Sequence, residues 1–363
     1  MAAIDLESTF QALYYASLLS ILSVGITLSY MTTKVFNFAH VRFAMVASYV
    51  AATIILVLAK SFNIHGDFAW HNMAGMQVRV PLPWWVYAVA LVSAFIVGGL
   101  VAVAQYYLVL RPLQKRGAGS MALMISTLGF DFILVAVLFI YMTLPQIRRL
   151  TVKTISLVGR VAFDSLRMDS LDIVISNGSV TVRGAVILAM VFALATIIGL
   201  YLLLTRTKLG VMMRSSIENP NLALVLGINV DRVFAITWFI AGAIAGLAGY
   251  LFIFATVYLT PVSPTTPSDQ IIVSVFAGSI VGGINSVPGS IGGGFLIGLI
   301  EKFFVPLLSP IAGPGIVKYD KVFSMLAVAL TLLFIPEGLA SVNWRRVLGL
   351  GRVKVRKAEE VKA

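Results

Sequence analysis

The chain has 363 residues, of which 59% are hydrophobic and 12% charged, and its mean hydropathy is +0.97. This composition is too apolar for a soluble domain and predicts an all-α polytopic membrane protein, and the absence of cysteine excludes disulfides and thiol chemistry. The net charge of +12 does not indicate nucleic acid, because the basic residues lie between apolar runs and in residues 345–362, with no soluble domain to present them.

The first apolar run, at about 10–31, lacks a basic leader and a small-residue cleavage site, so we expect a retained membrane span rather than a signal peptide. A polar interruption containing Asn37 and His40 leads without a long loop into a second span at 43–58. Such a break is tolerated at membrane depth only where protein or a water-filled cavity surrounds it. His40 is expected either to satisfy the broken-helix backbone or to contact substrate.

Two further spans are predicted at 84–110 and 121–144, joined by a short basic turn that is expected inside. The second carries Asp131 near its middle. A charged side chain at the bilayer centre costs roughly 2.5–3.5 kcal/mol on insertion scales. We therefore expect Asp131 to face the bundle interior, where it bonds to a neighbouring helix or contacts substrate.

Residues 145–183 form the largest polar segment. Their mixture of β-branched and polar residues predicts a few short strands, with Asn177 and Gly178 in a hairpin turn. Alternation of the spans places this segment outside. Its basic residues oppose the positive-inside trend, but that trend weakens for longer loops.

A span at 184–204 and another at about 233–257 flank a polar loop, 205–232. The loop has four basic residues and two carboxylates: Arg206, Lys208, Arg214 and Arg232, with Glu218 and Asp231. A loop this basic beside membrane spans is expected on the cytoplasmic side.

The centre of this loop has the punctuation of a short helix. Asn219 is placed to cap it, Pro220 suits its first position, and Gly227 suits a left-handed stop. A helix of about two turns is marginal alone in water, so its apolar side chains need a docking surface, either on this protein's membrane domain or on a partner. The alternative is a plain cytoplasmic connection.

The last spans are predicted at 269–283, 288–308 and 321–335. This gives about nine transmembrane helices, with the N-terminus outside and the C-terminus cytoplasmic. Glu301 and Lys302 lie within one span and are expected to pair with other helices or to reach an interface.

A second break, containing Asn285, interrupts the apolar sequence near residues 282–289. Breaks in both halves suggest internally repeated transporter architecture with broken or re-entrant helices. Glycines four residues apart are expected to pack helices tightly; the pairs are Gly242 and Gly246, Gly278 and Gly282, Gly289 and Gly293, and Gly294 and Gly298. Residues 1–340 thus form a membrane domain with a small β-containing external loop, and 341–363 form a basic cytoplasmic tail.

Enzyme motifs are missing from the sequence. It has no Gly-rich phosphate loop ending in Lys-Ser or Lys-Thr, no His-Glu-x-x-His and no metal-ligand cluster. The chain is therefore not expected to be an enzyme or to bind metal, and it has no visible means of hydrolysing ATP.

Four stretches, in order along nearly the whole chain, carry a family resemblance. Residues 37–40 are similar to an Asn-Phe-Ala-His-Gly motif in which Val41 here replaces the glycine, and residues 226–229 match a cytoplasmic Leu-Gly-Ile-Asn signature. Residues 282–293 resemble a Gly-Gly, Ser-Ile-Pro-Gly and Gly-Gly run, and residues 336–339 match a Pro-x-Gly-Leu ending. The chain resembles the permease subunits of ABC importers of the branched-chain amino acid type.

The resemblance implies a translocation path for branched-chain amino acids or similar small solutes, driven by partner ATPases. The expected partners are a second related permease, two cytoplasmic ATPase subunits carrying ATP and magnesium, and an external substrate-binding protein that contacts residues 145–183. No cofactor is expected in this chain. The residues expected to couple to the ATPases are Arg214, Glu218, Asn219, Leu222, Leu226 and Gly227, and the substrate-path candidates are Asn37, His40, Asp131 and Asn285.

A different class of transporter remains open on the residues alone. In a self-contained ion-coupled secondary transporter or channel, Asp131, Glu301 and His40 would form an ion relay. Transport that depends on an ion gradient without any ATPase would identify this alternative.

Overall fold

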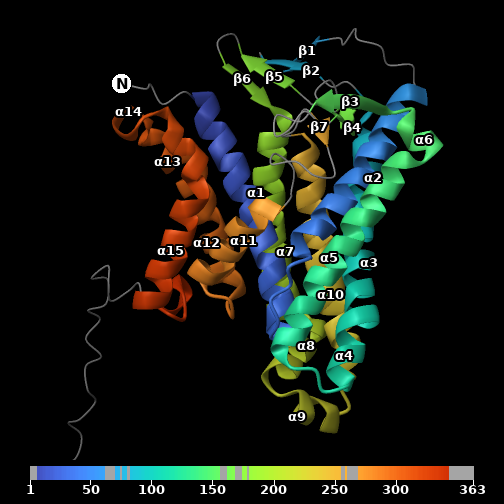
Figure 1. The fold of residues 1–363 in the computed structure, drawn as a ribbon, viewed down its shortest axis with the longest axis vertical. Coiled ribbons are helices and arrows are strands. Elements are labelled where there is room, and N and C mark those ends of the chain that lie inside the picture. The colour runs from blue at the N-terminus through green and yellow to red at the C-terminus, as the bar shows by residue number, and fades with distance from the viewer. Residues whose placement is uncertain are drawn as a thin grey trace, which may run out of the picture.

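The computed structural model describes residues 6–61, 70–73, 76–79, 82–155, 162–167, 174–177, 180–254, 258–259 and 269–342. The expected basic tail lies mostly outside these residues. Long helices run side by side, with the strands at one end of the bundle and the short helix α9 at the other (Figure 1).

The helices before the polar loop are α1 (Leu6–Thr33), α2 (His40–Ser61), α3 (Trp84–Gln105), the π-helical η1 (Tyr106–Leu110), α4 (Arg111–Lys115), α5 (Ser120–Thr143), α6 (Pro145–Arg148) and α7 (Gly184–Arg206). Those that follow are α8 (Lys208–Glu218), α9 (Pro220–Val225), α10 (Val230–Ile253), α11 (Asp269–Gly282), α12 (Val287–Leu299), the π-helical η3 (Ile300–Phe304), α13 (Val305–Leu307), α14 (Ser309–Ala312), the 3₁₀ turn η4 (Pro314–Tyr319), α15 (Asp320–Phe334) and the 3₁₀ turn η5 (Leu339–Ser341).

Seven helical segments in the described part of the chain are long and apolar enough to cross a membrane. The prediction of a polytopic helical membrane protein is therefore confirmed. The expected spans at 269–283 and 321–335 correspond to α11 and α15, which have only 14 and 15 residues. A helix needs about 20 residues to cross the hydrocarbon core unaided, so the count of nine is not established by helix length.

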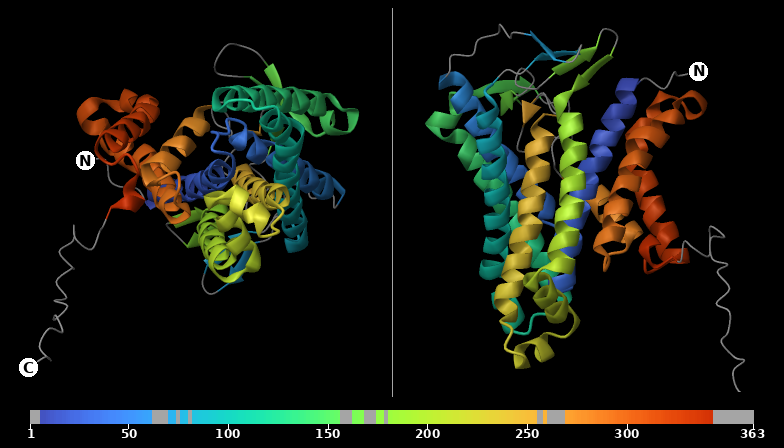
Figure 2. Two further views of the ribbon diagram at one scale, coloured as in Figure 1. Left: turned by 90° about the horizontal axis from the view of Figure 1, so that it is seen from below. Right: turned by 180° about the vertical axis from the view of Figure 1, so that it is seen from behind.

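Helix α1 is the centre of the bundle. Most of its side chains after Ala12 are buried, and it contacts α7, α10, α11 and α12. Figure 2 shows α1 enclosed by the other helices, whereas α5 and α15 lie on the outside. Many side chains of these outer helices are apolar and exposed, as expected for surfaces that face lipid or another membrane subunit.

Small residues bring the inner helices into close contact, as the glycine spacing predicted. On α10, Gly246 approaches the backbone of Ala94 on α3, and a Cβ at this position would overlap the Ala94 carbonyl oxygen. On α11, Gly278 faces Gly294 of α12 in the same way. Without a hydrophobic driving force between helices in lipid, such backbone proximity is a main source of packing energy.

The strands form two small antiparallel sheets at one end of the bundle (Figure 1). The sheet orders are β1-β2-β5-β6 and β3-β4-β7. The strands are β1 (Trp70–Met73), β2 (Met76–Arg79), β3 (Thr151–Ile155), β4 (Ala162–Arg167), β5 (Val174–Asn177), β6 (Val180–Arg183) and β7 (Tyr258–Leu259). Strands β5 and β6 pair around the position expected for the hairpin turn. Strands β2 and β7 come from outside residues 145–183, and the sequence did not indicate these long-range pairings.

The close approach of α10 to α3 can be tested with a single methyl group. Replacing Gly246 with alanine is expected to destabilise the purified protein by about 1–3 kcal/mol, because the new Cβ meets the Ala94 backbone. The matched control is Gly199→Ala on α7, where nothing lies within 4 Å and the higher helix propensity of alanine contributes up to about 1 kcal/mol. Thermal unfolding in detergent would measure both, and equal stability of the two variants would contradict the packing argument.

Candidate functional site

The first break, between α1 and α2, is held by side chains. Asn37 is fully buried, and its Oδ1 accepts hydrogen bonds from the backbone N–H of Ala39 at 3.1 Å and from Nε2 of Gln105 at 3.0 Å. Gln105 is also fully buried and ends α3. Asn37 therefore ties the start of α2 to the point where α3 becomes π-helical.

Helix α5 supplies a further hydrogen-bond acceptor to the break. The backbone N–H of Phe38 donates to Oγ1 of Thr127 at 3.2 Å, and Thr127 is fully buried on α5. Unpaired backbone groups inside a membrane cost several kcal/mol each. The break thus lies where neighbouring helices supply the hydrogen bonds that its own helices lack.

His40, the first residue of α2, is completely buried. Its ring packs edge-on against Phe43, with 5.7 Å between ring centroids, and lies against Gly25 of α1. A Cβ at Gly25 would overlap the imidazole Nε2, so the glycine makes room for the histidine ring. His40 is therefore part of the contact between α1 and α2.

Asp131 has an ionic partner on α2. Nε of Arg42 donates to Oδ1 of Asp131 at 2.8 Å, and Nη2 donates to Oδ2 at 3.1 Å. The Arg42 side chain is only 5% exposed. This bidentate pair keeps both charges within the membrane domain by compensating one with the other. The sequence indicated a bonded or substrate-contacting Asp131 but not which residue would pair with it.

The second break, between α11 and α12, has the same kind of local support. Gly283 has a φ of +114°, and the Ser286 side chain accepts a hydrogen bond from the Gly289 N–H at the start of α12. Asn285 is exposed, and its Oδ1 accepts a hydrogen bond from Nζ of Lys34 at 3.1 Å. The two breaks are in direct contact although their residues lie 251 positions apart.

The structure therefore places all four substrate-path candidates around residues 34–42. Asn37 and His40 belong to this segment, Asp131 bonds to Arg42, and Asn285 bonds to Lys34. Whether substrate touches them stays a prediction.

The polar loop folds as its punctuation predicted. The Asn219 side chain accepts a hydrogen bond from the Leu222 N–H at 3.0 Å, Pro220 is the first residue of α9, and Gly227 has a φ of +79°. The N–H of Ile228 then bonds back to the carbonyl of Ala223, completing a glycine-based helix stop. The chain reverses twice within a few residues, which makes α9 a compact projection.

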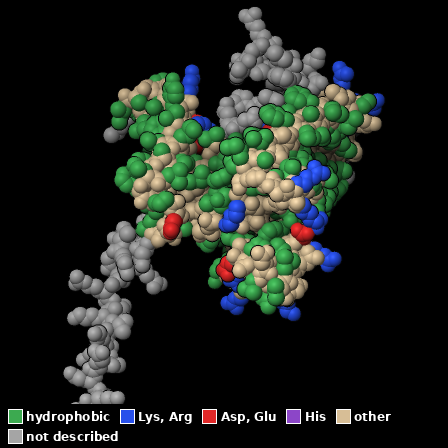
Figure 3. Space-filling view, turned by 60° about the horizontal axis from the view of Figure 1, so that its bottom comes forward, with side chains coloured by type: hydrophobic (Ala, Val, Ile, Leu, Met, Phe, Trp, Pro, Cys, Tyr) green, Lys and Arg blue, Asp and Glu red, His purple; other side chains and the backbone are tan. Residues whose placement is uncertain are grey.

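Most side chains of this projection point into solvent. Ala223 is buried, whereas Val225 is 83% exposed. Other exposed members of the loop are Arg214, Glu218, Asn219, Leu222, Leu224, Leu226 and Gly227. Figure 3 shows Lys and Arg side chains around this end of the molecule. The predicted coupling residues thus form an exposed apolar tip with charged surroundings, and the fold does not cover it.

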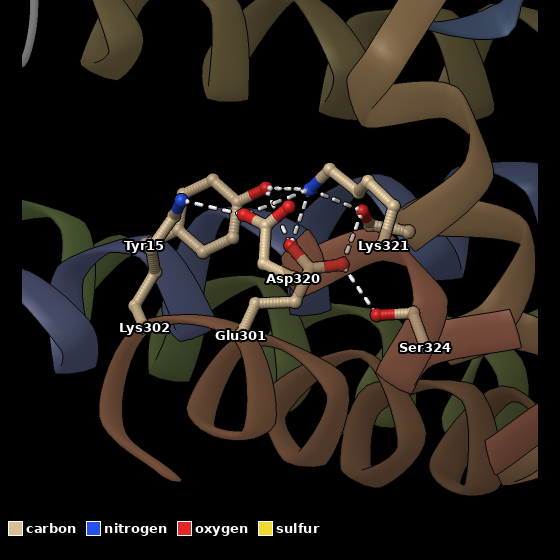
Figure 4. Close-up of polar contacts among 7 residues, drawn as sticks. Tyr15, Glu301, Lys302, Asp320, Lys321 and Ser324 are labelled. Carbon is tan, nitrogen blue, oxygen red and sulfur yellow. Dashed lines mark hydrogen bonds and ion pairs between the residues drawn. The ribbon is translucent and has the colours of Figure 1, made fainter. Parts of the chain in front are cut away.

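A buried ionic network in the last third is more extensive than the sequence suggested (Figure 4). Glu301, in η3, is fully buried and accepts hydrogen bonds from Tyr15 of α1, Ser274 of α11, and Lys321 and Ser324 of α15. One carboxylate therefore joins four helical elements. The Ser274 bond is 2.6 Å and the Tyr15 bond is 3.0 Å.

A second ion pair lies beside it, between Nζ of Lys302 and Oδ2 of Asp320, at 3.0 Å. The expectation that Glu301 and Lys302 pair with other helices is confirmed. The available sequence signal was two adjacent acid–base pairs, Glu301 with Lys302 and Asp320 with Lys321, at the two ends of an apolar stretch. That signal gives complementary charges but not the participation of Tyr15.

Comparison with known proteins gives a consistent match. Residues 8–335 match the family described as "Branched-chain amino acid transport system / permease component". The chain is 34% identical over 337 residues to the probable branched-chain amino acid transport permease protein LivH of Methanocaldococcus jannaschii, covering 93% of this chain and 92% of that protein.

Bacterial relatives cover as much of the chain. The identity is 26% over 334 residues with the high-affinity branched-chain amino acid transport system permease protein BraD of Pseudomonas aeruginosa, covering 92% of this chain and 95% of BraD. It is 25% over 337 residues with the corresponding LivH of Escherichia coli, covering 92% and 94%. No solved structure matches the chain.

Long apolar helices around two contacting breaks, with a capped projection at one end, define a membrane transport component of the permease class. The chain belongs to the family of permease components of branched-chain amino acid transport systems. Proteins of this family are the membrane-spanning subunits of ABC importers, so the chain is a transport component and not an enzyme. ATP hydrolysis in such systems belongs to partner ATPases.

The Arg42–Asp131 pair gives a stability prediction. Asp131→Asn is expected to destabilise the protein by about 3–5 kcal/mol, because it leaves a buried guanidinium without its counter-charge. The double variant Arg42→Met with Asp131→Leu is expected to recover most of that loss, since neither charge then remains. Thermal unfolding of the single and double variants would measure the difference. Equal destabilisation by the single and double changes would argue against mutual charge compensation.

Proposed function

We propose that this chain forms part of the path by which branched-chain amino acids, or similar small aliphatic solutes, cross a cell membrane under the control of ATPase subunits. The observation that carries the proposal is the exposed, capped helix α9. Its local bonds are complete while its apolar side chains lack cover. The names of the relatives, which specify branched-chain amino acid transport, support the solute class.

The proposed topology has the N-terminus outside and the C-terminus in the cytoplasm. The basic polar loop at the α9 end is then cytoplasmic, as the positive-inside trend favours, and the strands at the opposite end of the bundle form the external β-containing region. Helices α11 and α15, added to the seven long apolar helical segments, give about nine crossings. The basic tail, 341–363, follows on the cytoplasmic side.

The proposed partners are a second related permease, two ATPase subunits that hold ATP and magnesium, and an external substrate-binding protein. A short helix that leaves Leu222 and Leu226 exposed is suited to a groove on an ATPase subunit, with Arg214 and Glu218 at its margin. Closure of the paired ATPases would then move α9 and, with it, the spans that it joins. Residues 145–183 would meet the binding protein at the other end.

An ion-coupled secondary transporter is less well supported. Asp131 is bonded to Arg42, and Glu301 is bonded to Lys321. Among the described residues, the two carboxylates bond to separate sets of partners, and His40 lies between α1 and α2. An ion relay through these residues would have to break two compensated buried pairs.

The docking role of α9 predicts a selective loss. Val225→Asp is expected to reduce ATP-driven solute uptake and ATPase co-purification by roughly tenfold or more, because it places a charge in an apolar contact. Membrane insertion of the permease should be unchanged, since Val225 is 83% exposed and contributes little to the fold.

The matched control is Ile311→Asp on α14, where the isoleucine is 88% exposed. Helix α14 lies toward the strand end of the bundle (Figure 1). This variant should keep its ATPase subunits. Retention of ATPase binding and uptake by Val225→Asp would exclude α9 as the docking element.

The absence of native cysteine allows a direct test of topology. Single cysteines replacing Thr151 and Tyr319 are expected to react with a membrane-impermeant maleimide added to intact cells. Cysteines replacing Asn221 and Glu337 should react only after the membrane is opened. Opposite accessibility of positions 319 and 337 would show that α15 crosses the membrane, whereas equal accessibility would reduce the number of crossings.

A further inference from the structure

Lys34, at the end of α1, has an unusual backbone conformation. Its φ of +54° makes it the one non-glycine residue with positive φ in the described part of the chain. Glycine would adopt this conformation without the steric cost that a Cβ imposes. A lysine at such a position indicates that its side chain contributes something that glycine cannot.

The Lys34 ammonium has neutral partners. Nζ donates to Oδ1 of Asn285 at 3.1 Å and lies 5.5 Å from the ring centroid of Tyr30. No described carboxylate lies within 4 Å of it. This contrasts with Arg42 and Lys321, whose charges are compensated by Asp131 and Glu301. Lys34 is exposed and keeps an uncompensated positive charge where the two breaks meet.

Aromatic rings lie next to this charge. Tyr30 and Phe36 have ring centroids 4.9 Å apart, and Phe276 of α11 is 5.6 Å from Phe36 and 5.2 Å from Phe38. All four rings are partly exposed. They form an apolar wall, contributed by both halves of the chain, beside a cation and an amide oxygen.

These groups are complementary to an α-amino acid with an aliphatic side chain. Its carboxylate needs a cation, which Lys34 supplies, and its ammonium needs an acceptor, which Asn285 Oδ1 supplies. The ligand's ammonium and carboxylate are attached to one carbon, so their partners must lie close together. Lys34 and Asn285 meet this condition, because Nζ and Oδ1 are 3.1 Å apart. The aliphatic side chain would then contact the rings of Phe36, Phe38 and Phe276.

We propose that Lys34, Asn285 and the rings of Tyr30, Phe36, Phe38 and Phe276 form a transient binding site for the zwitterionic head and aliphatic side chain of the transported amino acid. This inference rests on the proposed function, which it extends from a solute class to particular contacts. In the empty site, Asn285 and the Tyr30 ring hold the Lys34 ammonium in place. In the occupied site, the substrate inserts between Lys34 and Asn285.

Lys34→Gly separates this role from a structural one. Glycine accommodates the φ of +54° more easily than lysine, so the variant should fold and keep its thermal stability. ATP-driven leucine uptake by the assembled transporter is expected to fall by about tenfold or more, because a charge-assisted bond to the carboxylate is lost. Lys34→Arg should retain part of the uptake. The control is Lys60→Ala, which removes another exposed lysine, at the end of α2.

Direct protection of the Lys34 amine provides a readout that does not depend on transport. The full chain would be treated with an amine-reactive reagent, alone, with leucine, or with leucinol, which lacks the carboxylate, and the modification of Lys34 and Lys60 would be measured by mass spectrometry. Leucine and leucinol also consume the reagent through their own amines, so the readout is the ratio of Lys34 modification to Lys60 modification within each sample. Leucine should lower this ratio, and leucinol should leave it unchanged.

The outcomes distinguish this site from the proposed function. Absence of ATP-driven branched-chain amino acid uptake by the wild-type complex would overturn the proposed function, and protection of Lys34 by leucine would still support the site. Full uptake by Lys34→Gly, or modification of Lys34 that leucine leaves unchanged, would overturn the site even where the wild type transports leucine.

Discussion

An interrupted helix inside a membrane must find hydrogen-bond partners for the backbone groups that the interruption leaves unpaired. In this chain that requirement fixes the neighbours of both breaks. At the first break, the Ala39 N–H donates to Asn37 Oδ1 and the Phe38 N–H donates to Thr127 Oγ1 of α5. Gln105 of α3 donates to the same Asn37 Oδ1 and holds that side chain in place. The second break is satisfied locally, by Ser286 and by the positive φ of Gly283. Helices α3 and α5 therefore have to lie beside the start of α2.

Small residues make these arrangements possible. The side chains of a break can reach a neighbouring helix only when the backbones are close, and glycine and alanine permit that approach between α10 and α3 and between α11 and α12. The two buried ion pairs impose a second condition. Arg42 must accompany Asp131, and Lys321 must accompany Glu301, because either charge alone would be costly in this environment. Close packing and charge compensation thus fix different helix pairs: close packing joins α10 to α3 and α11 to α12, and the ion pairs join α2 to α5 and η3 to α15.

Features set by a few adjacent residues could be predicted from the sequence. Each bond of the cap at Asn219 and of the stop at Gly227 joins residues no more than five positions apart, and the long spans follow from hydropathy alone. Features set by distant residues could not. Arg42 and Asp131 are 89 positions apart, and many basic residues were available as partners until the fold placed α2 against α5. The meeting of Lys34 with Asn285 is concealed in the same way, because 251 positions separate the two residues.

The projection at α9 and the first break are joined by an uninterrupted series of contacts. Asp231, in the first turn of α10, accepts a hydrogen bond from Arg111 Nε at 3.1 Å, so the base of α10 is tied to α4. Helix α4 continues through the π-helical η1 to Gln105, which bonds to Asn37 in the break. Short π-helical segments are frequent at functional sites. Here η1 lies between Gln105, which bonds to Asn37 in the break, and Arg111, which bonds to Asp231 at the end of the polar loop. A displacement of α9 relative to the bundle therefore has a physical route to Asn37 through side-chain bonds and one continuous helix. Arg111 reaches Asp231 at the end of the polar loop, and Gln105 reaches Asn37 in the segment that also carries Lys34.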